Sequence, residues 1–387
     1  MHRSSPVRRA LALLLGLALF ALSRPGPARA ADNKFDTVAF DTVDGVTLKG
    51  SFYKSAKGKD EPTVLFLHKL GSDSHKDGWD DLAKALNDKG YSVLSFDFRG
   101  HGGSTSVDPQ KFWSYTWNRE LAHKSGPTEK GKPRETISRE AFVSSGYYRY
   151  LVNDIAAAKM FLDERNDAGD CNSRALILIG AEDGAALGAL WMAADWNRYS
   201  ADKVILDPRG PRFPALITGV SKESEGKDQY CAVWLSMSPN LGGKVSVNGA
   251  LKADLKLVGR EKKVPMAFLY GQEDREGEEH AKAYLQSITG GSTEVSDKLP
   301  NTAMRAVKST KLAGSALLRK NLGTDELILG YLGKTREKHV VNKWKQVESD
   351  RTAYVWVVPG LVRPVPAKEE KGKALEPIPP AVIGLAQ

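Results

Sequence analysis

The chain has 387 residues, with 56 Lys and Arg against 47 Asp and Glu, and a formal net charge of +9. Five of the excess positive charges are arginines in the first 30 residues, which leaves about +4 on the remaining stretch of about 357 residues. Lys and Glu are interspersed there, so composition gives no support to nucleic-acid binding. That length suits one large α/β domain or two small ones.

The first 30 residues predict a cleaved export signal. Arginines precede an apolar run at 11–22, and Ala28-Arg29-Ala30 is the small-x-small pattern that signal peptidases cut. The run is too short to span about 30 Å of hydrocarbon. We therefore expect a Sec-type signal and a periplasmic or extracellular protein, with an uncleaved N-terminal anchor as the alternative. No later segment predicts an integral membrane helix.

Strands and helices alternate along the first part of the chain. Short continuous apolar runs predict buried parallel strands, and Asp44-Gly45 predicts a tight turn between the first two strands. The expected elements are strands at 38–40, 46–53, 64–67 and 91–96, and a helix at 79–86.

Residues 105–146 interrupt this alternation. The segment begins with several aromatic residues and continues with many Lys, Gly and Pro. It is longer than ordinary connections, which predicts a cap-like insertion over one face of the domain. A disordered surface insertion is the alternative.

The alternation then resumes and predicts a doubly wound, mostly parallel sheet with helices on both faces. Thr324 is expected to be the N-cap of the last helix. The domain is expected over 31–358, and the Pro-, Lys- and Glu-rich residues 359–387 predict a flexible tail. The expected helices are at 147–164, 185–194 and 278–288, and the expected strands at 175–179, 203–206, 232–236, 266–270, 303–308 and 354–358.

Three local patterns in this order resemble the α/β-hydrolase family. They are LFLHKLG at 65–71, FDFRGHGGS at 96–104 and LIGAEDG at 178–184. The second closely matches a well-known loop of that family. The resemblance extends over about residues 38 to 332 and implies the family's fold. The glycines at 100–103 lack the context of a phosphate-binding loop.

The family carries its nucleophile on a sharp strand-to-helix turn with the pattern Gly-x-Ser-x-Gly. Gly180 and Gly184 hold the outer positions, so Glu182 falls where the nucleophile belongs. Haloalkane dehalogenases and epoxide hydrolases use Asp there, but Glu is one methylene longer, and a misplacement of about 1 Å can cost about a hundredfold in rate. We expect Glu182 to be a solvated or salt-bridged residue at a disused site, with a nucleophilic role as the alternative.

Of the other two members of a hydrolase triad, the acid has a candidate in this sequence and the histidine has none at the expected place. The resemblance places Asp274 at the acid position, although an Asp after a strand is also common in turns. The family's histidine should follow the last core strand, but the loop at 310–315 has none. Without an imidazole, nothing obvious moves a proton for the nucleophile. His280 or His339 would need an unusual route to the site.

A family oxyanion hole would form from backbone amides near the strand ends. His68 and His101 are expected to make structural hydrogen bonds there rather than act in catalysis. Lys69 stands where the family usually has Gly, and we expect it to form an ion pair with Glu182. The residues assigned to the oxyanion region are His68, Lys69, Leu70 and Asp183.

Cys171 and Cys231 each lie close to a predicted core strand. Adjacent parallel strands are about 4.8 Å apart, within reach of a disulfide, so a bridge is one hypothesis and two free thiols the other. No spacing suggests a metal site, and no cofactor is expected.

The sequence therefore leads to one main functional hypothesis. It is an exported pseudo-hydrolase that lacks Ser-His-Asp activity and keeps a cleft for a small-molecule ligand. The alternative is a hydrolase of ester, amide or epoxide substrates that uses Glu182 in place of serine. A third hypothesis is an envelope interaction protein that works through its C-terminal tail. The sequence does not indicate an oligomeric state.

Overall fold

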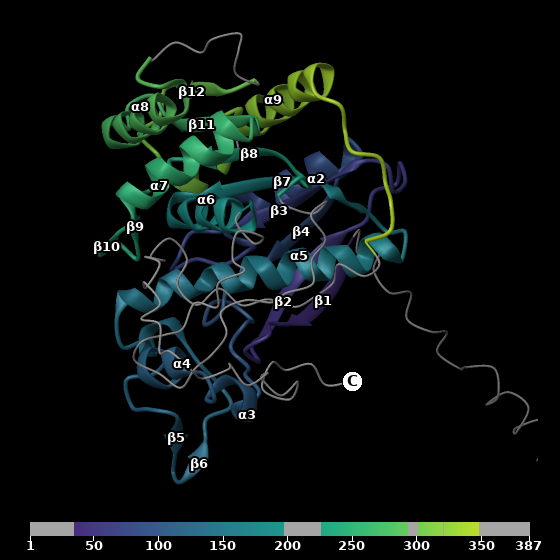
Figure 1. The fold of residues 1–387 in the computed structure, drawn as a ribbon. Helices are drawn as coiled ribbons and strands as arrows, with labels where there is room; N and C mark the ends of the chain where they lie inside the picture. Colours follow the sequence, from purple (N-terminus) through teal and green to yellow (C-terminus); the bar gives the residue numbers. More distant parts are fainter. Residues whose placement is uncertain (1–34, 197–225, 293–300, 320, 348–387) are drawn as a thin grey trace, which may run out of the picture. The chain divides into compact units, whose positions relative to one another are not determined.

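The computed structural model describes residues 35–196, 226–292, 301–319 and 321–347. The export signal, the strands expected at 203–206 and 354–358, and the tail lie outside these ranges. The described part contains an eight-stranded sheet in the order β1-β2-β4-β3-β7-β8-β11-β12 (Figure 1). Its strands are β1 (Asp36–Asp41), β2 (Thr47–Tyr53), β3 (Pro62–Leu67), β4 (Ser92–Phe96), β7 (Asn172–Ala181), β8 (Gln229–Leu235), β11 (Met266–Gly271) and β12 (Ala303–Val307).

The sheet is mostly parallel, as the apolar runs predict. Only β2 runs antiparallel to its neighbours β1 and β4, and every other pairing is parallel. The chain builds outward from β3 to β4 on one side and then returns to add β7 on the other. The carboxyl ends of β3 and β7 therefore flank the point where the strand order reverses, which is where open α/β sheets bind ligands.

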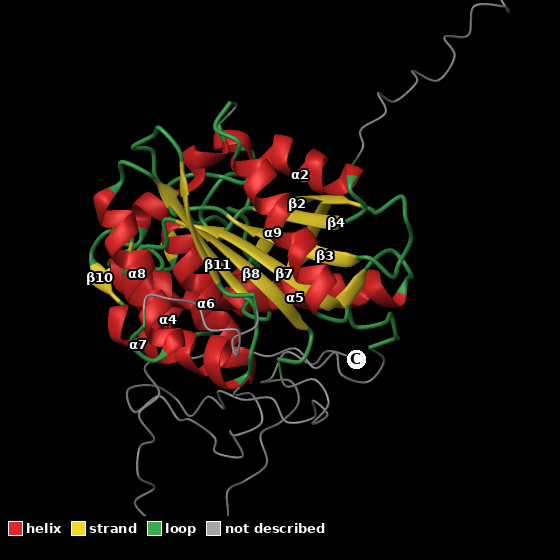
Figure 2. Cartoon of the chain, turned by 90° about the horizontal axis from the view of Figure 1, so that it is seen from above, coloured by secondary structure: helices red, strands yellow, loops and turns green. Residues whose placement is uncertain are grey.

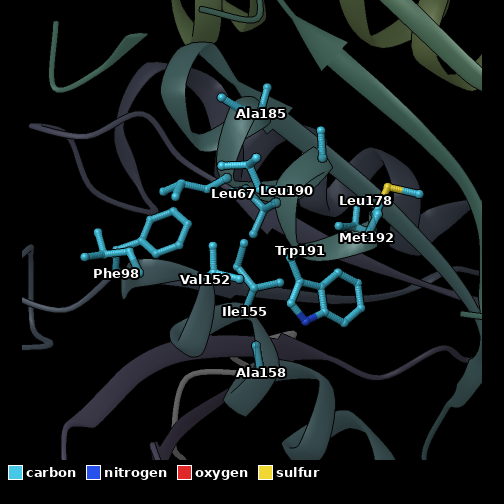
Figure 3. Packing of buried hydrophobic residues seen from close by; sticks show 14 of the residues in the cluster. Leu67, Phe98, Val152, Ile155, Ala158, Leu178, Ala185, Leu190, Trp191 and Met192 are labelled. Atoms are coloured by element: carbon cyan, nitrogen blue, oxygen red, sulfur yellow. The ribbon is translucent and has the colours of Figure 1, made fainter. Parts of the chain in front are cut away.

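Helices cover both faces of the sheet (Figure 2). One apolar cluster joins the sheet to α5, α6, α7 and α8, and a second joins its other face to α2 and α9. Figure 3 shows side chains of the first cluster, where Leu190 and Trp191 of α6 lie near Leu67 and Ile155. The helices are α2 (Trp79–Asp88), α5 (Val152–Asp167), α6 (Glu182–Trp196), α7 (Asn248–Leu255), α8 (Arg275–Thr289) and α9 (Thr324–Lys338).

Residues 105–146 are folded. The segment contains the short helices α3 (Pro109–Phe112) and α4 (Thr116–Leu121) and a small hairpin of β5 (Thr128–Glu129) and β6 (Lys132–Pro133). Its buried side chains, Phe112 among them, join the first apolar cluster. These contacts explain why the segment is ordered despite its many Lys and Gly. Its role as a cap stays a prediction.

Two helix starts differ from expectation. Gly323, with φ of 69°, is the N-cap of α9, and Thr324 is its first residue. The prediction of Thr324 as N-cap was wrong because its buried hydroxyl donates to the carbonyl of Leu317 instead of an amide of its own helix. The helix expected from 147 begins as the tighter 3-10 turn Ser145–Leu151 and becomes α-helical at Val152.

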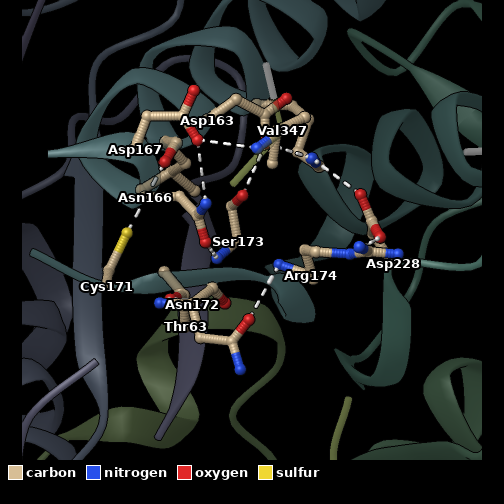
Figure 4. Close-up of polar contacts among 12 residues, drawn as sticks. Thr63, Asp163, Asn166, Asp167, Cys171, Asn172, Ser173, Arg174, Asp228 and Val347 are labelled. Carbon is tan, nitrogen blue, oxygen red and sulfur yellow. Dashed lines mark hydrogen bonds and ion pairs between the residues drawn. The ribbon is translucent and has the colours of Figure 1, made fainter. Parts of the chain in front are cut away.

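The hypothesis of a disulfide is also wrong. Both cysteines are free and buried. Cys231 lies inside β8, where it pairs with Ile177 of β7. Ile177 is six residues after Cys171, so the two cysteines are about 20 Å apart along the strands. They also face opposite sides of the sheet. The Cys171 thiol donates instead to the carbonyl of Leu162 (Figure 4).

The segment after α9 crosses the amino-terminal ends of the strands. Asn342 donates to the carbonyls of Arg174 and Lys227, close to the starts of β7 and β8. The Trp344 indole donates to Asn166, and the amide of Val347 donates to Asp167 (Figure 4). Residues 342–347 are therefore hydrogen-bonded to the end of the sheet that lies opposite the carboxyl ends of the parallel strands.

Candidate functional site

The candidate site forms where β3 and β7 end. Glu182 is the first residue of α6 directly after β7, and its backbone adopts φ of +49°. The two glycines around it are required by close packing. A Cβ on Gly180 would lie 2.7 Å from the Cα of Ala185, and one on Gly184 would lie 2.2 Å from the carbonyl oxygen of His68. The structure thus keeps the sharp turn that the family uses to present a nucleophile.

Glu182 makes the ion pair expected from the sequence. Lys69 Nζ lies 3.3 Å from Glu182 Oε1, and about a third of each side chain is exposed. The same oxygen lies against Gly314, where an added Cβ would be 2.1 Å from Oε1. Gly314 belongs to the loop that should carry the family's histidine. The glutamate therefore fills the space that a side chain from this loop would need.

The side chain of Asp183 accepts a hydrogen bond from the Leu70 amide, which is one of the donors expected to form the oxyanion hole. Its Oδ1 accepts a 2.7 Å hydrogen bond from the amide of Leu70, and its Oδ2 a 3.1 Å bond from Gly242. Burial raises the pKa of Asp183 to about 6, while the bonds from Leu70 and Gly242 oppose that rise and the charge of Glu182 adds to it. In this arrangement the Leu70 amide is not free to hold a substrate oxygen.

Asp274 lies at the end of β11, as predicted, but its carboxylate has other partners. One oxygen accepts a hydrogen bond from the hydroxyl of Ser236, and the other caps α8 by accepting from the amide of Gly277. Turn and cap chemistry thus accounts for its position. Among the described residues, these two hydrogen-bond donors do not include a histidine.

The histidines of the described ranges make other contacts. His68 donates from Nδ1 to the carbonyl of Lys69 and accepts at Nε2 from the amide of Phe98, which fixes a neutral ring. Burial lowers its pKa further. His101 donates from Nδ1 to the backbone carbonyl of Arg99, and burial lowers the pKa of its ring to about 4. The remaining described histidines lie elsewhere, at His75, His123, His280 and His339.

Several site residues were missed by the sequence reasoning. Gly314 lies against Glu182, the amide of Gly242 donates to Asp183, and the hydroxyl of Ser236 donates to Asp274. For Gly242 the local signal is the pair Gly242-Gly243, because two adjacent glycines often mark a turn. Gly314 belongs to the loop at 310–315, which the family resemblance had already placed near the site. Arg139 of the insertion is a fourth, since its guanidinium lies against Gly71.

The described side chains include no group of three or more His, Cys, Asp or Glu arranged to hold a metal ion. Within the same ranges, no helix has the length and apolarity needed to span a membrane.

A family model described as the alpha/beta hydrolase family matches residues 64–295. This is more than half of the chain, and the protein therefore belongs to the α/β-hydrolase family. The comparison with curated proteins found no match.

Solved structures with a similar fold share little sequence. An esterase of Pyrococcus furiosus is 15% identical over 78% of this chain and 90% of its own, with a TM-score of 0.47. A dienelactone hydrolase of Anabaena variabilis is 13% identical over 80% of this chain and 100% of its own, with a TM-score of 0.45. A serine hydrolase without lid from Xanthomonas campestris is 12% identical over 79% and 96%, with a TM-score of 0.43.

The contact between Glu182 and Gly314 can be tested by measuring the free energy of unfolding of single and double variants. Gly314→Ala should destabilise the protein, because a positive φ costs a non-glycine residue about 1–2 kcal/mol and the new Cβ also displaces the carboxylate. In the Glu182→Ala background only the backbone cost should remain. We expect a coupling of about 0.5–1 kcal/mol between the two changes in urea unfolding. Strict additivity would show that the side chains at 182 and 314 do not meet.

Proposed function

We propose that this protein is an exported pseudo-hydrolase, which keeps the family's ligand-binding edge but lacks Ser-His-Asp catalysis. The observation that carries the proposal is the position of Glu182, paired with Lys69 and pressed against Gly314. A paired carboxylate in that position is a poor nucleophile, and no described side chain stands ready to activate water against an ester on it.

The surroundings support the same conclusion. Ester hydrolysis on this fold needs a free amide to hold the developing oxyanion. The Leu70 amide already donates to Asp183. The ligand expected from the sequence is a small molecule, and the partly exposed Lys69 and Glu182 are the groups it would meet first.

Export follows from the first 30 residues and forms part of the proposal. Cleavage after Ala30 would leave a mature chain that starts at Ala31. Mass measurement of the protein recovered from the periplasm or medium should give that start. A full-length protein retained in the cell would contradict export.

The proposal is tested by turnover. A panel of ester, amide and epoxide substrates should show no hydrolysis above that given by the Glu182→Ala variant. That variant should fold normally, because a partly exposed ion pair contributes only about 0–1 kcal/mol.

One observation favours the alternative of a hydrolase that uses Glu182. Its backbone stays in the left-handed region, and backbone strain of about 1–3 kcal/mol tends to persist at functional sites. In that mechanism the carboxylate would attack a ring carbon of an epoxide, break its C–O bond and form a covalent ester, whereas attack on the carbonyl of an ester or amide would form a mixed anhydride and release the alcohol or amine. Detection of such an ester would decide for the alternative.

A further inference from the structure

The carboxylate of Asp183 bridges two loops that are far apart in the sequence. Leu70 belongs to the loop after β3, and Gly242 lies between the short strands β9 (Asn240–Leu241) and β10 (Val245–Ser246). Each amide donates to a different oxygen of Asp183, at 2.7 and 3.1 Å. The two donors are therefore placed to hold both oxygens of a single carboxylate.

Two cations flank these amides. Lys69 directly precedes Leu70, and the Arg139 guanidinium lies so close to Gly71 that a Cβ there would be 2.3 Å from Nη1. About a third of each cationic side chain is exposed. Carboxylates bind best where backbone donors and such cations converge.

The other charged or titratable groups around Asp183 are few. Glu182 precedes it in the chain and is paired with Lys69. Tyr148 packs against Gly242, and Lys244 is exposed on the same turn. Arg139 is paired with Glu140 at 3.3 Å. Once Asp183 is neutral, the positive charges of Lys69 and Arg139 are therefore balanced by the negative charges of Glu182 and Glu140, and the extra negative charge of Asp183 is gone.

We propose that the amides of Leu70 and Gly242 form a binding site for the carboxylate group of a small ligand, and that the side chain of Asp183 occupies this site until it is protonated. The inference deepens the proposed function and relies on it only for the presence of a ligand at this edge of the sheet.

The direction of the pH effect follows from the pKa of Asp183, which burial raises to about 6. Above that pH the carboxylate holds both amides and repels an anion. Below it, the neutral acid is a weaker acceptor and gives up the amides. Because the pKa of Asp183 in the folded protein lies above the ordinary aspartate value of 3.8, the associated stability is fully present below pH 3.8 and is lost as pH rises through about 6.

Benzoate is a suitable probe, because it stays mostly ionised over the relevant range. With a pKa of about 6, roughly nine-tenths of Asp183 is protonated at about pH 5 and roughly 3% at about pH 7.5. If only the protonated form admits the ligand, benzoate should bind about 30-fold more weakly at the higher pH. Calorimetric titration of the full protein measures both affinities.

The matched variant is Asp183→Asn, which keeps the shape of the side chain and removes its charge. It should bind benzoate at about pH 7.5 nearly as tightly as the unchanged protein does at about pH 5. Asp254→Asn is the control, since burial also raises the pKa of Asp254, to about 7, on the separate helix α7. It should leave the 30-fold dependence intact.

Three results would overturn the inference. They are equal affinity at both pH values, a pH dependence that survives in Asp183→Asn, and no benzoate binding by either protein. Amide NMR shifts of Leu70 and Gly242, which should titrate together near pH 6 and only when Asp183 is present, confirm the location. None of these readouts depends on turnover, so catalysis by Glu182 would refute the proposed function without affecting this test.

Discussion

Replacing Arg99 with alanine is expected to destabilise the protein by about 3–5 kcal/mol, because it leaves two buried carboxylates without their counter-charge. The Arg99 side chain is fully buried and bonds Asp44 at 2.6 Å and Asp154 at 2.7 Å. It also donates to the hydroxyl of Tyr147, which in turn donates to Asn118 of the insertion. The loss should appear as a lower urea midpoint.

The two carboxylates depend on Arg99 to different degrees. Burial alone would raise the pKa of Asp44, but its four hydrogen bonds and the charge of Arg99 lower it. Asp154 accepts two bonds, and burial raises its pKa to about 6. Removal of the guanidinium should therefore raise the pKa values of both carboxylates, and acidification should recover part of the lost stability.

The control for Arg99 is an exposed arginine with one acidic partner. Arg319 pairs with Asp77 at 3.1 Å, and 57% of its side chain is exposed. Arg319→Ala should cost no more than about 1 kcal/mol. Equal losses for Arg99→Ala and Arg319→Ala would show that the buried network does not hold the insertion to the core.

The second large effect concerns the turn at Glu182. Gly184→Ala should cost about 2–3 kcal/mol, because its Cβ would lie 2.2 Å from the carbonyl oxygen of His68 and 2.6 Å from that of Leu67. Both contacts are with backbone, which cannot move aside without shifting β3 from β7. Thermal and urea unfolding would measure the loss.

A glycine in an ordinary helical position provides the comparison. Gly330 lies inside α9, and an added Cβ there would meet nothing within 4 Å. Gly330→Ala should therefore raise stability by about 0.4–1 kcal/mol. A similar gain from Gly184→Ala would mean that the turn is looser than the close contacts indicate.

The sheet could be predicted because each core strand carries its own local signal. The apolar runs at 64–67 and 266–270 lie within β3 and β11. The turn at Glu182 could also be predicted, since Gly180 and Gly184 stand at fixed spacing around it. Its pairing with Lys69 followed from placing two family motifs at the ends of neighbouring strands.

The remaining features depend on contacts between distant segments. The family resemblance places the loop at 310–315 near Glu182, but it does not indicate that Gly314 itself meets the carboxylate. Nor does the sequence indicate that Gly242 supplies an amide to Asp183, because that contact depends on how a separate loop folds over the strand ends. The disulfide prediction failed for a related reason. Neighbouring strands were inferred correctly, but their register was not, and Cys231 is opposite Ile177.

Peptide mass spectrometry can show whether Glu182 does covalent chemistry. The protein would be incubated with activated esters, alkyl halides and epoxides, quenched in acid and digested, with Glu182→Ala as the matched control. We expect an unmodified peptide around Glu182 and identical product release from both proteins. An ester on Glu182 formed from an alkyl halide or an epoxide, or turnover of any of these reagents that disappears in Glu182→Ala, would contradict this expectation.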